Sequence, residues 1–251
     1  MKEQRIQSIT NYIHSQGTVS LDDLCEKFGV SKNTIRRDVN KIIQTGEVQK
    51  VYGGVMSLSN ELLPFDNRSS ENYQQKEAIA KRAAAFIENN DLVFIDSGTT
   101  TCSIPKYIDS NKKITIITNS LSVVNESVAK ENFDIILIGN KLKRQTQSFV
   151  NVDDWLSFDR MNINKAFLAA TGLSVDKGIT NSDILEYEIK HRVVQKASQN
   201  ILLVDHTKFN KAALLTYCSF NDLTTIVSDR PVPVEYDATL REANVNVILA
   251  N

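Results

Sequence analysis

The sequence has few of the side chains that build disulfide frameworks, metal sites or membrane spans. Its three cysteines, Cys25, Cys102 and Cys218, and its three histidines are widely separated along 251 residues. This spacing provides neither a disulfide framework nor a set of zinc ligands, and it fits a reducing cytoplasm. The chain contains no run of about 18 apolar residues, and its first residues enter an amphipathic helix rather than a signal peptide. We therefore expect a soluble, cytoplasmic protein with no metal, no cofactor and no membrane partner.

Net charge is also nearly absent, at -1, but the charges are not evenly distributed. Residues 27–53 contain six basic side chains against only Asp38 and Glu47, a local excess of four positive charges. A concentration of this kind is typical of a surface that binds nucleic acid. The length of the chain allows two domains, one of them small.

Residues 31–43 have two faces of opposite chemistry. Ser31 is a suitable N-cap, and four β-branched residues between positions 35 and 43 recur at helical spacing, which predicts a helix with one buried stripe. The adjoining stripe is polar and cationic, as reading base edges and holding phosphates in a major groove require; the alternative is a solvated charged face. From this segment we expect DNA contacts by Ser31, Lys32, Asn33, Thr34, Arg36, Arg37, Asn40 and Lys41.

A second short helix is predicted just before this one. Ser20 can cap residues 21–28, in which apolar side chains repeat at helical spacing, and Gly29 is placed to end the helix in a left-handed conformation. Two short helices joined by a tight turn that contains glycine, with the second helix basic, are typical of a helix-turn-helix. This pattern favours DNA binding over the solvated face.

The segment after the basic helix predicts a β-hairpin. Residues 48–52 and 55–58 flank Gly53-Gly54, a two-residue hairpin signal. We interpret the hairpin as a wing whose Lys50 and Tyr52 contact the phosphate backbone or the minor groove.

Three regions follow from these patterns. Residues 1–56, which begin with an expected helix over 2–16, form a winged helix-turn-helix DNA-binding domain. Residues 57–75 are polar and lose periodicity, which indicates a linker. Within it, Leu62, Leu63 and Phe65 are expected to dock on one of the two domains. Residues 76–251 are expected to form the domain that binds an effector and associates with other copies.

The third region alternates helical patterns with apolar runs rich in β-branched residues. One such helix is expected over residues 183–199. Strands that are buried on both faces and alternate with helices indicate a parallel α/β sheet, in which ligands bind where the strands end. The expected strands are residues 92–95, 114–117, 135–138, 166–169, 201–204, 225–227 and 245–249.

Small, hydroxyl, amide or cationic residues follow five of these runs. Residues 96–101 form a hydroxyl-rich loop that leads into an expected helix, whose backbone amides would suit a phosphate group. Each loop alone could be merely a capped turn, but their recurrence points to one pocket for a phosphorylated, sugar-like ligand. The expected effector-binding residues are Asp96, Ser97, Gly98, Thr99, Thr100, Thr101, Thr118, Asn119, Ser120, Gly139, Thr171, Gly172, Asp205, Lys208 and Lys211.

These motifs, in this order, resemble the DeoR family of bacterial transcriptional regulators over nearly the whole chain. In the first domain the resemblance rests on residues 30–31, 34–38, 46 and 52–54, and in the second on residues 96–100, 118–120, 139, 170–172 and 205–209. Residues 31–34, 180–190 and 214–217 are similar to the branch of the family that represses myo-inositol catabolism in Gram-positive bacteria.

The resemblance implies a sensor domain similar to the ribose-5-phosphate isomerase and CoA-transferase fold. It also implies a homo-oligomer, dimer or tetramer, that binds operator DNA and is released by a phosphorylated pathway intermediate. The alternative is an enzyme, a sugar-phosphate isomerase with a DNA-binding arm. Such isomerases need a positioned carboxylate, but residues 170–173 supply none and the next is Asp176, so we expect a sensor without catalytic residues.

Overall fold

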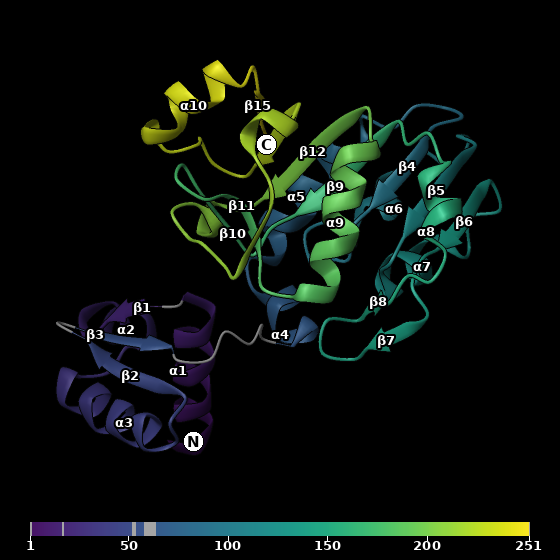
Figure 1. Cartoon of the computed structure of the whole chain (residues 1–251). Helices are drawn as coiled ribbons and strands as arrows, with labels where there is room; N and C mark the ends of the chain where they lie inside the picture. The colour runs from purple at the N-terminus through teal and green to yellow at the C-terminus, as the bar shows by residue number, and fades with distance from the viewer. Residues whose placement is uncertain (1, 17, 52–53, 58–63, 251) are drawn as a thin grey trace. The chain divides into compact units, whose positions relative to one another are not determined.

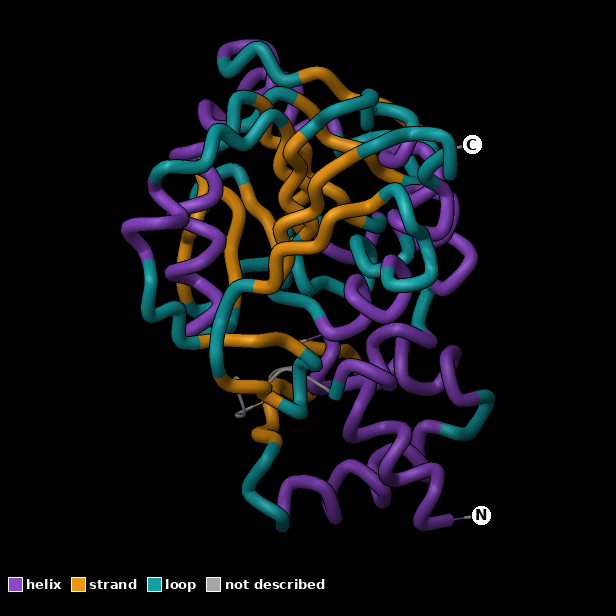
Figure 2. Tube along the Cα trace, turned by 90° about the vertical axis from the view of Figure 1, so that its right-hand side faces the viewer, coloured by secondary structure: helices purple, strands orange, loops and turns teal. Residues whose placement is uncertain are grey.

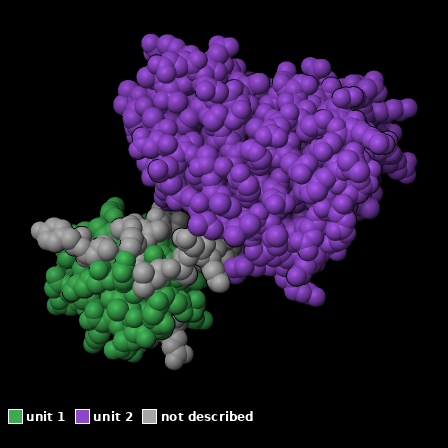
Figure 3. Space-filling model, in the orientation of Figure 1, with its two compact units in different colours: residues 1–63 green, residues 64–251 purple. Residues whose placement is uncertain are grey.

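The computed structural model describes residues 2–16, 18–51, 54–57 and 64–250 (Figure 1). The chain divides into two compact units, Met1–Leu63 and Pro64–Asn251, which are coloured separately in Figure 3. Each unit has its own hydrophobic core. No helix among the described residues is long and apolar enough to cross a membrane.

The first unit packs three helices against a small antiparallel sheet with strand order β1-β3-β2. The expected helices and wing are present, whereas β1 was not predicted. Gly54 lies in β3 and pairs with Val51, so its assignment to the hairpin turn was wrong; Tyr52 and Gly53 lie outside the described residues. The elements are α1 (Lys2–Gln16), β1 (Thr18–Ser20), α2 (Leu21–Phe28), α3 (Lys32–Gln44), β2 (Val48–Val51) and β3 (Gly54–Ser57).

Local hydrogen bonds set the ends of α2 and α3 as the sequence predicts. The Ser20 hydroxyl accepts the Asp23 N–H at 3.0 Å, and Gly29 ends α2 with φ of 62°. The Ser31 hydroxyl accepts the Thr34 N–H at 3.4 Å at the start of α3. The helices then bury one face each in a common core made of Ile9, Ile13, Val19, Leu24, Ile35, Val39, Ile42, Val48 and Val55.

The second unit is built on a seven-stranded parallel sheet with strand order β15-β14-β12-β9-β4-β5-β6. All seven apolar runs identified in the sequence are strands of this sheet, which confirms the α/β class. The strands are β4 (Leu92–Ile95), β5 (Ile114–Thr118), β6 (Phe133–Leu137), β9 (Lys165–Ala169), β12 (Gln199–Val204), β14 (Thr225–Ser228) and β15 (Asn246–Leu249).

Helices cover both faces of the sheet, with α9 on one and α5 on the other (Figures 1 and 2). In β12, Leu202 and Val204 pack in the same apolar cluster as α9, while Ile201 and Leu203 pack in the cluster of α5. Because both sets are apolar, the strands show continuous apolar runs rather than alternation. The helices are α4 (Phe65–Ser70), α5 (Tyr73–Ala84), α6 (Ile104–Tyr107), α7 (Leu121–Ser127), α8 (Trp155–Asp159), α9 (Ile184–Lys196) and α10 (Asp237–Glu242).

Two further small sheets were not predicted. They are the hairpin β7 (Lys141–Lys143) and β8 (Ser148–Val150), and a sheet of β10 (Gly172–Ser174), β11 (Gly178–Asn181) and β13 (Leu215–Cys218). These short strands contain polar or small residues and are therefore not the continuous apolar runs that marked the strands of the large sheet.

Part of the expected linker is helical. Residues 65–70 form α4, and α5 begins at Tyr73, three residues earlier than the expected domain. Phe65 is 6% exposed, and its N–H donates to the Gln145 carbonyl at 2.8 Å. Leu62 and Leu63 lie outside the described residues. One buried aromatic residue in a polar stretch gives no periodic signal, and for this reason the sequence did not reveal α4.

Candidate DNA-binding surface and effector site

The exposed face of α3 carries the polar residues expected to contact DNA. Ile35, Val39 and Ile42 are buried, and Lys32 forms an ion pair of 2.6 Å with Asp22 of α2. Among the expected contacts, Thr34 is half-buried beside the N-cap. Those that the structure leaves exposed are Ser31, Lys32, Asn33, Arg36, Arg37, Asn40 and Lys41.

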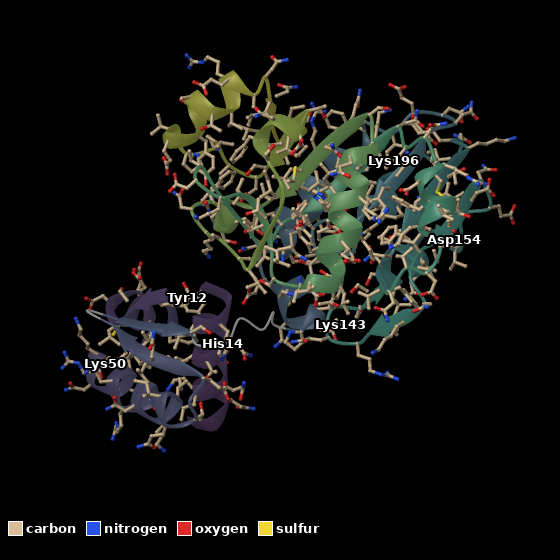
Figure 4. All side chains as sticks on the ribbon, viewed as in Figure 1. Tyr12, His14, Lys50, Lys143, Asp154 and Lys196 are labelled. Atoms are coloured by element: carbon tan, nitrogen blue, oxygen red, sulfur yellow. The ribbon has the colours of Figure 1, made fainter. Side chains whose placement is uncertain are left out.

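The wing and α3 share one hollow. Its volume is about 390 Å³, and its wall combines apolar side chains with Arg36 and Asn40 of α3 and Lys50 of β2. Lys50 is exposed on the wing (Figure 4), whereas Tyr52 lies outside the described residues. The structure thus places Lys50 with the cationic face of α3.

A partly buried ion pair, which the sequence analysis missed, joins α1 to α3. Arg5 Nε lies 2.8 Å from Asp38 Oδ2, and the Asp38 side chain is 1% exposed. Asp38 Oδ1 has no hydrogen-bond partner among the described residues. Leaving a buried carboxylate without its cation is costly, so Arg5 fixes the position of α3 relative to α1.

In the second unit, Asp96 is at the centre of the strand ends. Its Oδ1 accepts the Ser97 N–H at 2.8 Å, and its Oδ2 accepts the Ala169 N–H at 2.9 Å and forms a buried ion pair with Lys190 of α9. Lys190 also donates to the Ala169 carbonyl at 3.0 Å. Through these bonds the carboxylate holds β4, β9 and α9 together.

The loop 96–101 differs from the expected phosphate cradle. It continues as turns to residue 103, and the helix that follows, α6, begins only at Ile104 and has four residues. Thr101 is fully buried, and its hydroxyl donates to the Asp96 carbonyl at 2.6 Å. At Gly98 an added Cβ would lie 2.2 Å from the Ala169 Cβ, so this glycine lets the loop pack on β9. The half-buried Thr99 is the hydroxyl with most access to a ligand in this loop.

The loops after β5 and β6 use several expected ligand residues to build the site's frame. The Thr118 hydroxyl donates to the Ile95 carbonyl at 2.6 Å, and the Ser120 hydroxyl caps α7. Gly139 has φ of 92°, and a Cβ added there would lie 2.8 Å from the backbone carbonyl carbon of Phe149. Asn119 is buried, and its Oδ1 has no partner among the described residues, which makes it the polar atom here most in need of a ligand.

The loops after β9 and β12 come together at Lys211. An added Cβ on Gly172 would lie 2.7 Å from the Lys211 carbonyl oxygen, and the Lys211 N–H donates to the Leu173 carbonyl at 3.1 Å. The Thr171 hydroxyl donates to Asn181 Oδ1 at 3.4 Å. The structure therefore brings these loops together, as the sequence predicts.

A cluster of basic side chains lies at the ends of β12 and α5; we call Lys76, Lys208 and Lys211 the lysine cluster. Burial, reinforced by the nearby Lys208 ammonium, lowers the pKa of Lys76 and of Lys211 to about 8. Burial alone would raise the pKa of Asp205, but Lys208 and the Thr207 hydroxyl keep it below its usual value. Asp205 Oδ2 has no partner among the described residues. Mutually repelling, desolvated ammonium groups favour the binding of an anion.

Several charged residues near the site, Lys76, Arg68 and Glu186 among them, were not among the expected site residues. Arg68 of α4 is half-buried, and the loss of water around its guanidinium lowers its pKa, while the carboxylates of Glu186 and Asp96 oppose this shift. Glu186 is 6% exposed, and its Oε1 accepts the Ser148 hydroxyl at 2.7 Å. Lys76 and Arg68 belong to the stretch taken for a linker or its border, where no local pattern marks a pocket residue.

Comparison with known proteins gives consistent matches. The model of a DeoR-like helix-turn-helix domain matches residues 5–61, and that of a DeoR C-terminal sensor domain matches residues 71–230. The chain is 51% identical to the HTH-type transcriptional regulator IolR of Bacillus subtilis (strain 168), covering 100% of both chains. It is 28% identical to the glycerol-3-phosphate regulon repressor of Escherichia coli (strain K12), covering 98% of each.

Among solved structures, ribose 5-phosphate isomerase A from Methanocaldococcus jannaschii aligns with 55% of this chain and 55% of its own. The identity is 14% and the TM-score is 0.41, a likeness too low to carry an argument about function.

Proposed function

Because the chain belongs to the DeoR family of transcriptional regulators, we propose that it represses an inositol or related sugar catabolic operon. Repression ends when a phosphorylated intermediate of the pathway binds the second unit. The 51% identity to a regulator of equal length supports regulation of transcription and not catalysis. The bonds that tie Asp96 to β9 and α9 give this carboxylate a structural role, which is consistent with a sensor that does not turn its ligand over.

The observation that carries this proposal is the exposed face of α3. Seven of the eight residues expected to contact DNA from this segment are exposed, and four of the seven are lysine or arginine, while the opposite face is buried. Charge of this kind releases counterions from DNA, and amide or guanidinium groups can read base edges. A helix that carries both kinds of group on one face can bind the phosphate backbone and recognise the bases of an operator.

Support for a phosphorylated effector comes from the lysine cluster. The unsatisfied Asn119 Oδ1 is a hydrogen-bond acceptor, and it would suit a hydroxyl group of a sugar-like effector. Ammonium groups bind phosphate through charge-assisted hydrogen bonds, and a neutral sugar cannot replace them. The named regulon of the Escherichia coli relative is also that of a phosphorylated compound. The effector-binding residues are proposed on these grounds.

The protein acts as a homo-oligomer. One recognition helix contacts too few base pairs for high specificity, so two first units act together on a repeated operator. The second unit, which is larger, is the place for self-association, because the small first unit uses its apolar residues in its own core. The protein acts in the cytoplasm on the chromosome.

Mobility shift with DNA from upstream of the catabolic operon tests the DNA-binding face. Arg36→Ala should weaken operator binding by about 1 to 3 kcal/mol and relax base preference, as expected for a residue that reads guanine. Lys50→Ala should weaken binding to DNA of every sequence by the same factor. It should also reduce the salt dependence of binding by about one counterion. Lys177→Ala, at an exposed turn of the second unit, is the control. Parental binding by both Arg36→Ala and Lys50→Ala would contradict the proposed face.

A further inference from the structure

The guanidinium of Arg5 in α1 is only partly used by its ion pair with Asp38 of α3. Its Nε donates to Asp38 Oδ2 at 2.8 Å, and the Arg5 side chain is still 31% exposed. Among the described residues the guanidinium has no other partner. Because a guanidinium has five N–H donors, those on its two terminal nitrogens remain available to an anion.

Stability alone does not explain the burial of the Asp38 carboxylate. Its side chain is 1% exposed, and its Oδ1 has no hydrogen-bond partner among the described residues. Replacing a buried ion pair with apolar side chains of similar volume is often neutral or stabilising. What the carboxylate supplies instead is direction, because a bond to Nε fixes the plane in which the rest of the Arg5 guanidinium lies.

Asp38 and Arg5 lie at the edge of α3 that is opposite to the wing. Two residues turn an α-helix by about 200°, so Arg36 projects from the other side of α3 than Asp38. Arg36 lines the hollow that α3 shares with Lys50 of the wing. Asp38 instead faces α1, whose N-terminal end lies beside α3 in Figure 1.

A helix in the major groove has a phosphate backbone on each of its two sides, since the groove is only about 12 Å wide. Lys50 is placed to bind the backbone on the side of the wing. The expected contacts from α3 and the wing provide no matching cation on the opposite side beyond the helix itself. Arg5 is on that side, and its planar fork of N–H groups matches two oxygens of a phosphate.

We propose that Arg5 binds a backbone phosphate of the operator on the side of α3 opposite to the wing, and that Asp38 is the positioning residue that aims its guanidinium. This inference rests on the proposed function, because it assumes that the exposed face of α3 enters the major groove. It assigns a DNA contact to α1, which lies outside both the helix-turn-helix and the wing. A phosphate contact carries no base information, so it strengthens binding to DNA of any sequence.

The central variant of the test is Arg5→Met combined with Asp38→Leu. It replaces the ion pair with apolar side chains, a change that is often neutral or stabilising, and it leaves the net charge of the protein unchanged. Arg5→Gln removes the cation alone. The control is Lys27→Gln, at an exposed position of α2; the Lys27 ammonium lies 5.3 Å from the centre of the ring of Tyr12, about two turns along α1 from Arg5 (Figure 4).

The full-length proteins are compared on operator DNA and on an unrelated duplex, by fluorescence anisotropy between about 50 and 200 mM salt. The double variant should unfold thermally at the wild-type temperature or above, yet bind both duplexes about 10- to 100-fold more weakly. The ratio of the two affinities should stay at its wild-type value, and the salt slope should fall by about one phosphate contact. Arg5→Gln should show the same loss of affinity and slope, whereas Lys27→Gln should keep the wild-type slope.

Operators in which single phosphates are replaced by neutral methylphosphonates locate the contact. One such replacement, on the side of the groove opposite to the phosphates that Lys50 binds, should weaken the wild type but not the double variant. This coupling separates a direct contact from a structural effect, because a merely misplaced α3 would not make binding indifferent to one particular phosphate.

A wild-type affinity and salt slope in the double variant would show that the ion pair is structural only, and the proposed function would stand without the inference. A loss confined to the operator, with the slope unchanged, would mean that the pair only places the base-reading residues of α3. If the variants do not fold, the wild type still decides: phosphates that matter on one side of the groove alone would overturn the inference. Parental binding by both Arg36→Ala and Lys50→Ala would instead remove the docking face itself, and the inference with it.

Discussion

Effector affinity should fall steeply between pH 7 and pH 9. Burial first, and repulsion from Lys208 second, place the pKa of Lys76 and of Lys211 at about 8. A bound phosphate favours the ammonium form and raises both pKa values, so protons are taken up on binding and affinity is lost as pH rises through 8. The second pKa of a phosphate ester is about 6, so the ligand itself stays a dianion over this range. The other charged groups that face the two lysines are Asp205, Glu71 and, for Lys76, Arg68.

The magnitude follows from the titration of two groups with a pKa of about 8. Each lysine is about nine-tenths protonated at pH 7 and about one-tenth protonated at pH 9. Every lysine that must recover its proton to bind phosphate therefore costs about tenfold in affinity over this interval. The expected loss is about tenfold if one of the two binds the phosphate, and about 100-fold if both do.

Calorimetry of the most tightly binding phosphorylated compound, in buffers of different ionisation enthalpy at pH 7, 8 and 9, measures both the affinity and the protons taken up. Lys211→Met should remove one lysine's share of the pH dependence, whereas Lys177→Met, at an exposed turn, should leave it unchanged. An affinity that stays constant or rises between pH 7 and pH 9 would refute the assignment of the phosphate to this cluster.

Two other changes test separate parts of the site and the assembly. Thr99→Asp puts a negative charge beside the expected phosphate position without filling the core; the variant should bind operator normally but resist release by effector, and an unchanged midpoint of release in mobility shift would place the phosphate elsewhere. The second unit alone, residues 64–251, should associate in sedimentation or light scattering, so a monomer at all concentrations would argue against pairing through this unit. This fragment includes α4, which a start at residue 76 would remove.

The sequence was most informative where neighbouring residues by themselves show which faces of an element are buried. The β-branched runs that became the seven-stranded sheet were found because both of their faces are buried, and Ser20, Gly29 and Ser31 mark helix ends through their own local bonds. The exposed face of α3 was also predicted, apart from the half-buried Thr34, because its polar residues alternate with a buried apolar stripe.

Features that depend on distant residues were not accessible in this way. Arg68 and Glu186 come near the proposed effector site only through tertiary packing, and nothing near them in the sequence distinguishes them from surface charges. Conversely, Thr101 and Thr118 look like ligand residues, but their hydroxyls are bonded to backbone carbonyls of the site's own frame. Whether a small polar residue presents its group to a ligand or to the backbone is decided by the fold and not by composition.

The central claim is that a phosphorylated pathway intermediate releases this repressor from its operator. Its most direct test is titration of the wild-type operator complex with phosphorylated intermediates of inositol catabolism, beside their dephosphorylated forms, at fixed pH and salt. A coupling free energy of about 1 to 3 kcal/mol, typical of allosteric proteins, predicts that the phosphorylated effector weakens operator binding by roughly 5- to 150-fold. The dephosphorylated forms should leave the complex intact. Release by both forms at the same concentration, or by neither, would contradict the claim.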